Sequence, residues 1–446
     1  MANIVIFSYS NVTWTQEHYF DSFVTGFVNT LSRCGNNILN IDLQNFINNF
    51  KNEYICDANK SYITDIINSF SPDIIITFNN MIHDTNYIKN LECPIVLYPA
   101  DGIDFFWFKS FIHEELERYF FLNINEYHYK SLLNTFHDIK EKQLIPFGYV
   151  TDFHRKEIEQ DINLSFLGSI PNHDLAISRY LRKMHSDELN RLFYNAIEEF
   201  RRHPDEKFSL DLPNFKSDLG ISLETVAVWL ITCRDRFQLL SELFKHGLKL
   251  YGYSSFLDCC IYNYEFINHY CNELCVTQEQ SETLYNRSKI SLNLPNARAV
   301  NGFSWRVPDI LASQSVLLSF NSPDLHSLTK KYLDLPMYHS PEEAKELVKR
   351  LLKDDIWRHD ISIACNEVVE SHCRFEHYFQ NIENATGIKI FNKGTGSIHE
   401  LYKIDENLLY NQNIKYANKK KNKLEQIKKE LIKTLPYFIA KKILHK

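Results

Sequence analysis

Residues 284–319 read LYNRSKISLNLPNARAVNGFSWRVPDILASQSVLLS, and the order of elements in this stretch decides the fold. The apolar run 290–294 predicts a buried strand, which a polar, Asn-rich loop connects to a helix over 307–313. A second apolar run, 316–319, predicts the next strand. A strand, a helix and a strand in this order indicate parallel strands joined by a crossover helix.

The same alternation extends outward in both directions. In the first third of the chain we expect a helix over 16–32 and strands over 4–7, 37–42, 72–76, 95–98, 119–122 and 143–146. After the polar stretch 151–161 we expect strands over 164–167 and 248–251, a long helical region between them, and closing helices over 342–353 and 356–381. The rhythm predicts the α/β class with parallel sheets.

The restart near residue 155 predicts two Rossmann-like domains that face each other across a ligand cleft. We place the first over 1–155 and the second over 156–382, with a helical insertion at about 173–245. Residues 383–446 form a C-terminal extension that ends in a basic amphipathic helix.

Several common phosphate-binding patterns are missing from the sequence. No Gly-x-Gly-x-x-Gly follows the first strand, where Ser8, Tyr9, Ser10 and Asn11 stand, and there is no Walker A lysine motif. A bound dinucleotide such as NAD or FAD is therefore not expected, and we predict no cofactor. No Asp-x-Asp occurs, which removes the usual carboxylate pair that holds a metal under a diphosphate. We therefore predict no metal site.

The loop before the predicted helix at 307–313 is the densest candidate for a phosphate site. Backbone N–H groups at the start of a helix attract anions, and Arg306 can add a bidentate contact to a phosphate. Asp309, one turn later, can accept hydrogen bonds from two ribose hydroxyls. The alternative is a local ion pair between Arg306 and Asp309.

At these residues the chain resembles a known family, the CgeB-like, group 1 nucleotide-sugar glycosyltransferases of GT-B fold. Their second domain carries Tyr, then a Leu-Asn strand end, then Arg-x-x-Glu and a helix of small residues. The resemblance covers about residues 140–382. The matching positions are Tyr285, Leu292, Asn293, Arg306, Val307, Pro308, Asp309, Ala312 and Ser313, with FLGS at 166–169, YGY at 251–253, His372 and Arg374. Asp309 replaces the usual glutamate, and Gln314 stands where a glycine is common.

The resemblance implies a nucleotide-sugar donor held by the second domain, an acceptor held by the first, and no obligatory metal. As donor-binding residues it implies Gly168, Ser169, Gly252, Tyr253, Tyr285, Asn293, Asn301, Gly302, Phe303, Ser304 and Asp309. Arg306 would stabilise the departing nucleoside diphosphate. The acceptor is a glycan, a lipid-linked sugar or a protein.

An inverting transfer also needs a general base, expected at a strand end of the first domain. Asp101 is the leading candidate because it follows the strand over 95–98, although Pro-Ala-Asp-Gly also suits a turn. The other candidates for the general base are Asp104, Glu17, His18 and Glu126. We predict Asp101 and Arg306 as the catalytic residues.

Charge is unevenly distributed along the 446 residues, whose net charge is −7. From Lys415 on, the chain contains eleven Lys and two Glu, so this tail carries a net charge of +9 and the preceding residues carry −16. The acidic body disfavours nucleic-acid binding. The tail has apolar residues at helical spacing between its lysines, which suits a helix lying on an anionic membrane surface. Docking on the acidic body or on a second subunit is the alternative.

Together these features predict a metal-independent glycosyltransferase of bacterial surface polysaccharide or glycoconjugate synthesis. The alternative is a non-catalytic two-domain binding or assembly protein that retains the fold. No stretch approaches the roughly 18 uncharged apolar residues that a spanning helix needs. We expect a cytoplasmic protein, peripheral at the inner face of the membrane if the tail binds there.

Overall fold

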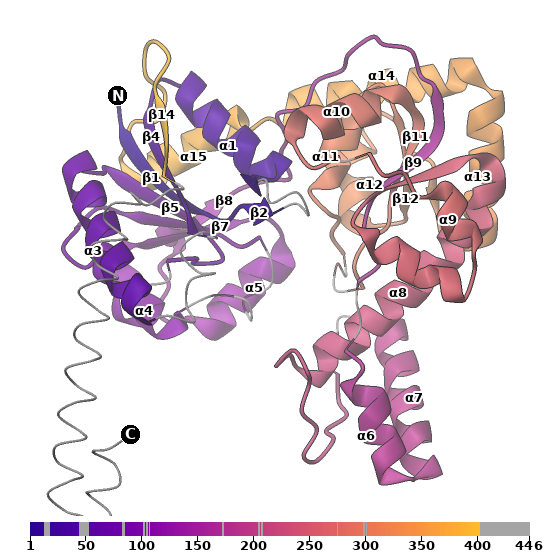
Figure 1. Cartoon of the computed structure of the whole chain (residues 1–446). Helices are drawn as coiled ribbons and strands as arrows, with labels where there is room; N and C mark the ends of the chain where they lie inside the picture. Colours follow the sequence, from indigo (N-terminus) through magenta and orange to yellow (C-terminus); the bar gives the residue numbers. More distant parts are fainter. Residues whose placement is uncertain are drawn as a thin grey trace, which may run out of the picture. The chain divides into compact units, whose positions relative to one another are not determined.

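Two parallel β-sheets organise the chain in the computed structural model (Figure 1). The structure describes residues 1–12, 18–43, 53–82, 85–100, 103, 106, 108–171, 174–203, 206, 208–273, 275–297, 299 and 301–401. The chain divides into two compact units. The first unit comprises Met1–Val12, Leu31–Ile145 and the chain from Ile382 on, and the second comprises Thr13–Thr30 and Pro146–Asn381.

The first unit is built on a seven-stranded sheet of order β14-β4-β1-β5-β6-β7-β8. Neighbouring strands from β14 to β7 run parallel. The strands are β1 (Asn3–Ser8), β4 (Asn37–Asp42), β5 (Ile74–Phe78), β6 (Ile95–Tyr98), β7 (Tyr119–Asn123), β8 (Leu144–Pro146) and β14 (Ile398–Leu401), with a short β2 (Asn11–Val12). Its helices include α3 (Glu53–Phe70), α4 (Lys109–Glu114) and α5 (Glu126–Thr135).

Central strands of the first unit consist mainly of consecutive apolar residues because both of their faces are covered. Ile74, Ile75 and Ile76 of β5 are fully buried, as are Ile95 and Val96 of β6. A strand with only one covered face would alternate between apolar and polar residues. The continuous apolar runs in the sequence therefore marked the middle of the sheet.

The second unit is built on a five-stranded sheet of order β10-β9-β11-β12-β13, in which all neighbouring strands run parallel. The strands are β9 (Ile162–Gly168), β10 (Leu248–Gly252), β11 (Ser288–Asn293), β12 (Val316–Phe320) and β13 (Met337–Tyr338). Its helices are α6 (Ala176–Met184), α7 (Asp187–Arg202), α8 (Leu223–Leu243), α9 (Glu265–His269), α10 (Gln278–Arg287), α11 (Arg306–Leu311), α12 (Pro323–Thr329), α13 (Pro341–Lys353), α14 (Asp355–His372) and most of α15 (Glu376–Thr386). The expected pair of parallel α/β domains is confirmed.

Helix α1 (Ser22–Arg33) starts later than the helix expected over 16–32, because His18–Tyr19 forms the short strand β3. The helix belongs to the second unit as far as Thr30. There the Phe23 and Phe27 rings each lie 5.5 Å from the Phe375 ring, centroid to centroid. A segment from the start of the chain is thus built into the aromatic core of the second unit.

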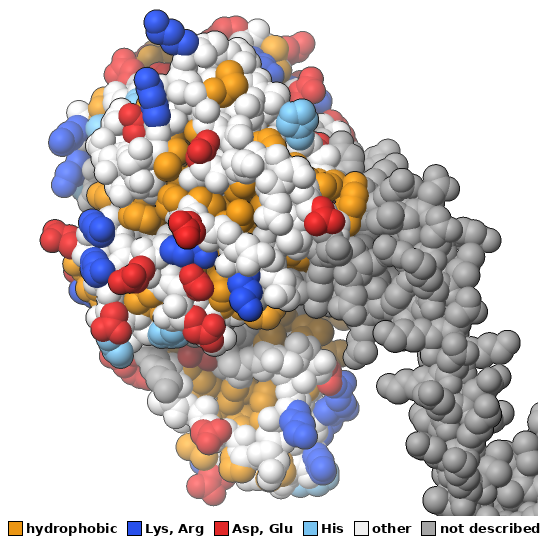
Figure 2. All heavy atoms as spheres, turned by 90° about the vertical axis from the view of Figure 1, so that its left-hand side faces the viewer, with side chains coloured by type: hydrophobic (Ala, Val, Ile, Leu, Met, Phe, Trp, Pro, Cys, Tyr) orange, Lys and Arg blue, Asp and Glu red, His pale blue; other side chains and the backbone are white. Residues whose placement is uncertain are grey.

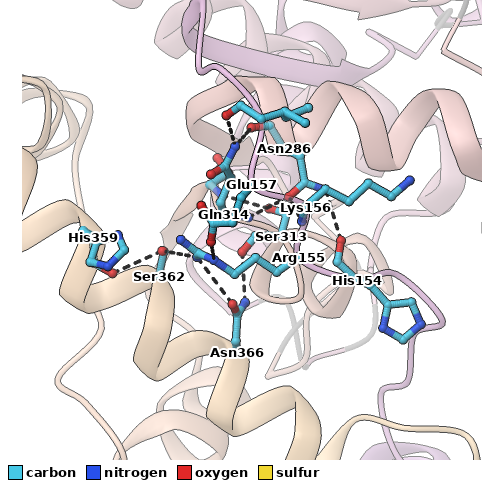
Figure 3. Close-up of polar contacts among 12 residues, drawn as sticks. His154, Arg155, Lys156, Glu157, Asn286, Ser313, Gln314, His359, Ser362 and Asn366 are labelled. Carbon is cyan, nitrogen blue, oxygen red and sulfur yellow. Dashed lines mark hydrogen bonds and ion pairs between the residues drawn. The ribbon is translucent and has the colours of Figure 1, made fainter.

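An extended segment, residues 151–161, crosses the second unit and is fixed by side-chain hydrogen bonds (Figure 3). Arg155 Nη1 donates to Ser362 Oγ on α14 at 2.7 Å. Gln314 Nε2 donates to the carbonyl oxygens of Ile158 and Asn286, each at 2.6 Å. A glycine at position 314 would lack both bonds, so the Gln314 side chain helps to fix the segment.

The first unit is completed by a strand that the sequence analysis did not expect, β14, which pairs with β4 in parallel. The chain reaches the edge of the sheet beside β4 through Gly396, whose N–H donates to the Ser32 carbonyl oxygen at 2.9 Å. A Cβ atom at this position would lie 1.7 Å from the Asn36 carbonyl oxygen. Only a residue without a side chain fits there.

Replacing Gly396 with alanine should destabilise the first unit. We expect a loss of about 2–3 kcal/mol of unfolding free energy, since the overlap involves backbone that must move. Gly394→Ala is the matched control: Gly394 has φ +85° but nothing within 4 Å of an added Cβ. It should cost only about 1–2 kcal/mol. Urea denaturation compares the two, and equal midpoints would contradict the steric account.

Charged side chains of both signs are interspersed on the face of the molecule in Figure 2, with hydrophobic groups between them. A mixture of this kind is typical of a solvated surface and produces little net field. The charges that could hold a ligand are instead found at the edge of the second unit's sheet.

Candidate functional site

The strand order of the second unit defines where a ligand would bind. The chain passes from β9 to β10 on one side and later returns to β11 on the other. In open parallel sheets, ligands bind at the carboxyl ends of the strands where the order switches direction. Here that switch point lies between β9 and β11. Gly168 and Ser169 stand at one strand end, and Asn293 and Leu294 stand at the other.

Two glycines bring the ends of β9 and β10 close together. Gly168 and Gly252 are register partners in the parallel pair. Gly252 has φ +119°, and a Cβ atom on it would lie 2.2 Å from the Gly168 carbonyl oxygen. Because other residues rarely adopt this φ, glycine is required at position 252. Both predicted donor-binding glycines therefore shape the backbone beside the switch point.

Arg236 connects the two strand ends, although the sequence analysis did not single it out. It lies on α8 and donates from Nη1 to the Ser169 carbonyl oxygen at 2.5 Å and from Nη2 to the Leu294 carbonyl oxygen at 2.8 Å. Its guanidinium carbon lies 5.8 Å from the centroid of the Phe166 ring. No motif surrounds Arg236 in the sequence, so only its position in the fold shows its relation to the site.

Arg306 is the first residue of α11. Within the described ranges its guanidinium makes no hydrogen bond and no ion pair. Its charge acts to lower the pKa values of Asp21, Asp309 and Arg236. α11 has only six residues. The capacity for anion binding therefore rests on the guanidinium rather than on the end of this short helix.

The loop between β11 and α11 is held by its own polar groups. Asn293 Nδ2 donates to Ser319 Oγ at 3.0 Å, and Asn293 Oδ1 accepts from Ser304 Oγ at 2.8 Å. The carbonyl oxygen of Asn301 accepts from Ser322 Oγ at 2.6 Å. Two predicted donor-binding residues, Asn293 and Ser304, thus bind each other and fix the path of the loop that leads to Arg306.

Other predicted residues of this loop differ in exposure. Asn301 is exposed and Gly302 is half-buried, with its carbonyl oxygen accepting from Ser322 Oγ at 3.1 Å. Phe303 is buried, and its ring stacks on that of Tyr149 at 3.8 Å between centroids. Phe303 therefore anchors the loop in the core, whereas Asn301 is open to solvent.

Asp309 is buried, and both of its carboxylate oxygens are occupied. Oδ1 accepts from Thr151 Oγ1 at 2.5 Å and Oδ2 accepts from Ser22 Oγ at 3.2 Å. Burial raises the pKa of Asp309 to about 7, and this effect outweighs the lowering by the two hydroxyls and by Arg306. The local ion pair between Arg306 and Asp309 does not form. Each carboxylate oxygen can still accept a further bond.

Two predicted tyrosines occupy opposite environments. Tyr285 is 1% exposed, and its buried hydroxyl has no hydrogen-bond partner in the described part of the chain. Burial raises its pKa, while Arg306 acts to lower it. Tyr253, just beyond Gly252, is exposed, and its hydroxyl lies 2.9 Å from that of Tyr19. Tyr253 is therefore the more accessible of the two.

The predicted general bases are not brought to this site by any described contact. Asp101, Asp104 and Glu17 lie outside the described residues, as does the side chain of His18. Glu126 begins α5 in the first unit, is exposed and pairs with Lys130 at 2.7 Å. The assignment of Asp101 stays a prediction.

The first unit has its own switch point, between β1 and β5, and polar side chains gather there. Asp42 accepts hydrogen bonds from the Ser10 N–H at 3.0 Å and from its Oγ at 2.5 Å. After β5, Asn79 and Asn80 are both buried and have positive φ values of 48° and 54°. Such conformations concentrate at functional sites.

The described residues contain neither a metal-binding cluster nor a membrane-spanning helix. Among them, no group of three or more His, Cys, Asp and Glu residues is placed to hold a metal ion. None of the helices in this part of the chain has the length and apolar character needed to cross a membrane.

Comparison with known proteins gives one family and a set of similar folds. Residues 234–384 match the family model described as Glycosyl transferase-like. This range starts two residues before Arg236 and includes Arg306 and Asp309. No curated protein matches the chain.

Solved structures are similar in fold at very low identity. Sucrose-phosphate synthase from Thermosynechococcus elongatus is 8% identical, with a TM-score of 0.50 over 85% of this chain and 97% of its own. The chain has the GT-B fold. TarM is 9% identical, with a TM-score of 0.42 over 74% of this chain, which spans 58% of TarM's length. BGT of phage T4, in complex with UDP and Mn²⁺, is 11% identical, with a TM-score of 0.45 over 86% of this chain and 99% of its own.

The expected fold class is therefore confirmed, and the Glycosyl transferase-like match supports sugar transfer at the coarse level. The finer assignment to the CgeB-like group stays a prediction.

Proposed function

We propose that the protein transfers a sugar from a nucleotide-sugar donor to a glycan, lipid-linked or protein acceptor in bacterial surface polysaccharide or glycoconjugate synthesis. The observation that carries the proposal is the guanidinium of Arg306, which has no hydrogen-bond partner in the described chain and lies near the switch point of a GT-B donor-type sheet. The Glycosyl transferase-like match over 234–384 supports it independently of this geometry.

Arg306 would act on the leaving group. During transfer, the bond between the anomeric carbon and the phosphate oxygen breaks while a bond to the acceptor oxygen forms. Negative charge then develops on the departing nucleoside diphosphate, and a positioned cation stabilises it. Since the sequence has no Asp-x-Asp, we propose that this charge is neutralised by the protein without an obligatory metal.

For an inverting transfer, a carboxylate must take the proton of the acceptor hydroxyl as the new bond forms. We propose Asp101 for this role and the first unit for acceptor binding. The buried polar residues Asp42, Asn79 and Asn80 at its switch point support a binding surface there, because ligands of open parallel sheets bind at this edge.

The remaining residues of the second unit would shape the donor site. Gly252 allows the close approach of strand ends, Asn293 and Ser304 fix the loop, and Tyr253 offers an exposed ring. The full set proposed for donor binding is Gly168, Ser169, Gly252, Tyr253, Tyr285, Asn293, Asn301, Gly302, Phe303, Ser304 and Asp309.

A second candidate, a non-catalytic binding protein with the same fold, is favoured by one observation. Both carboxylate oxygens of Asp309 already accept hydrogen bonds from Ser22 and Thr151, so a ribose would have to share them. Such a protein would bind an anionic ligand without turnover. Measuring product formation after a positive binding result separates the two candidates.

Nucleotide binding should raise the melting temperature of the full-length protein. In a panel of UDP, GDP, CDP, CMP and TDP nucleotides, a donor-site ligand at 100 times its Kd should stabilise the fold by about 2.7 kcal/mol. Differential scanning fluorimetry measures the shift, and adenosine at the same concentration is the control without phosphate. The absence of a shift with every nucleotide would contradict the donor site.

The basic tail from Lys415 lies outside the described residues. We propose that the protein is cytoplasmic and that the tail contacts either an anionic membrane surface or protein, namely the acidic body or a second subunit. Its net charge of +9 and its apolar residues at helical spacing suit both partners.

A further inference from the structure

Arg236 is held in place more firmly than an ordinary surface arginine. Its two terminal nitrogens donate to carbonyl oxygens that follow different strands, Ser169 after β9 and Leu294 after β11. The guanidinium therefore spans the switch point and lies near the ring of Phe166. A cation fixed in this way loses little side-chain entropy when it binds a ligand.

The charge of Arg236 has no counter-ion among the residues that the structure describes, because it forms no ion pair with any of them. The charged group with the largest effect on its pKa is a second cation, Arg306. Burial and then Arg306 lower the pKa of Arg236 to about 10, so it remains protonated near neutral pH. Burying a charge without a partner is costly, and placing two like charges together adds to that cost.

Carbonyl oxygens satisfy only part of the donor capacity of this side chain. A guanidinium carries five N–H groups, of which the two carbonyls take two. Nε is buried and has no partner, which leaves two terminal N–H groups on a half-buried side chain. Those N–H groups can form charge-assisted bonds to a phosphate oxygen.

We propose that Arg236 is a second anion-binding residue, which with Arg306 holds the two phosphates of a diphosphate at the switch point between β9 and β11. The identity of the anion as part of a sugar donor rests on the proposed function, whereas the two-arginine anion site does not. The bound diphosphate would supply the counter-charge that Arg236 lacks within the described part of the chain.

Isothermal titration calorimetry with inorganic pyrophosphate tests the site without assuming a nucleotide. The full-length protein is compared with R236Q, which removes the charge, and with R236K, which keeps it. Arg234→Gln is the matched control, because Arg234 lies two residues earlier on α8 and pairs with Glu198 at 2.8 Å on the surface. UDP, GDP, CDP and TDP are titrated into the same four proteins.

We expect R236Q to weaken pyrophosphate binding about 10- to 100-fold, the value of a charge-assisted hydrogen bond. R236K should stay within a few-fold of the unaltered protein, and R234Q should be unchanged. Pyrophosphate that fails to bind the unaltered protein, or binds R236Q equally well, overturns the proposal. A loss in R236K as large as that in R236Q also overturns it, because charge would then not be the cause.

Two further results separate this inference from the proposed function. Binding of pyrophosphate but of no nucleoside diphosphate leaves the anion site standing and removes the sugar-donor function. Nucleotide binding and transfer that are unchanged in R236Q leave the function standing and remove Arg236 from it. If melting curves show that R236Q does not fold, R236K decides the proposal by keeping or losing pyrophosphate affinity.

Discussion

Replacing Arg306 with alanine should abolish sugar transfer while the protein stays folded. Loss of a donor that stabilises developing charge typically lowers turnover about 10²- to 10³-fold, and this is the role that we propose for Arg306. The fold should tolerate the change because the guanidinium forms no hydrogen bond within the described residues. Turnover is measured with the donor identified in the nucleotide panel, and circular dichroism and melting curves check the fold.

Arg287→Ala is a suitable control for this variant. Arg287 lies at the end of α10 in the same unit, and its guanidinium forms two hydrogen bonds with the carboxylate of Asp161, at 2.9 and 2.7 Å. Its loss should leave turnover close to that of the unaltered protein. Unchanged turnover in R306A would remove Arg306 from the donor site, and an unfolded R306A would show a structural role instead.

Replacing Asp101 with asparagine should lower turnover far more than donor affinity. A general base contributes about 10²- to 10⁴-fold to the rate, and the amide cannot accept the proton of the acceptor hydroxyl. Steady-state kinetics with saturating donor measure turnover, and calorimetry measures donor binding. Asp104→Asn, three residues later, is the control and should retain turnover. If donor binding fell while turnover at saturation did not, Asp101 would not be the base.

Most of the strands could be predicted from the sequence because buried parallel strands contain runs of apolar residues. The runs around Ile75, Val96 and Leu292 each became a strand near the expected position. β14 could not be predicted in this way, because it lies at the edge of the sheet and its residues Ile398–Glu400 are exposed. A short exposed strand has no hydrophobic pattern, and only its pairing with β4 reveals it.

The candidate site was only partly predictable for a different reason. Arg306 and Asn293 lie in one continuous stretch, so spacing along the chain indicated them together. Arg236 comes from a helix far from that stretch in sequence and reaches the site through two backbone carbonyls. Bonds to backbone carbonyls leave no trace in side-chain identity, so no sequence pattern could indicate this contact.

The hydrogen-bond partners of Asp309 could not be predicted from the sequence. The sequence suggested either a ribose contact or an ion pair with Arg306. The structure places Thr151 and Ser22 against its carboxylate instead, from segments 158 and 287 residues away. Hydroxyl donors of this kind are common in any sequence, and only the tertiary fold selects them.

Neither unit is a continuous piece of the chain, and this limits how the protein can be divided. The second unit needs residues 13–30 from the start of the chain, and the first unit needs the segment from Ile382 that carries β14. During synthesis the first sheet therefore remains without its last strand until the whole second unit has left the ribosome. A chimera that exchanges the second unit must accordingly transplant residues 13–30 together with residues 146–381, because a single cut near residue 146 would separate Phe23 and Phe27 from their aromatic partner Phe375.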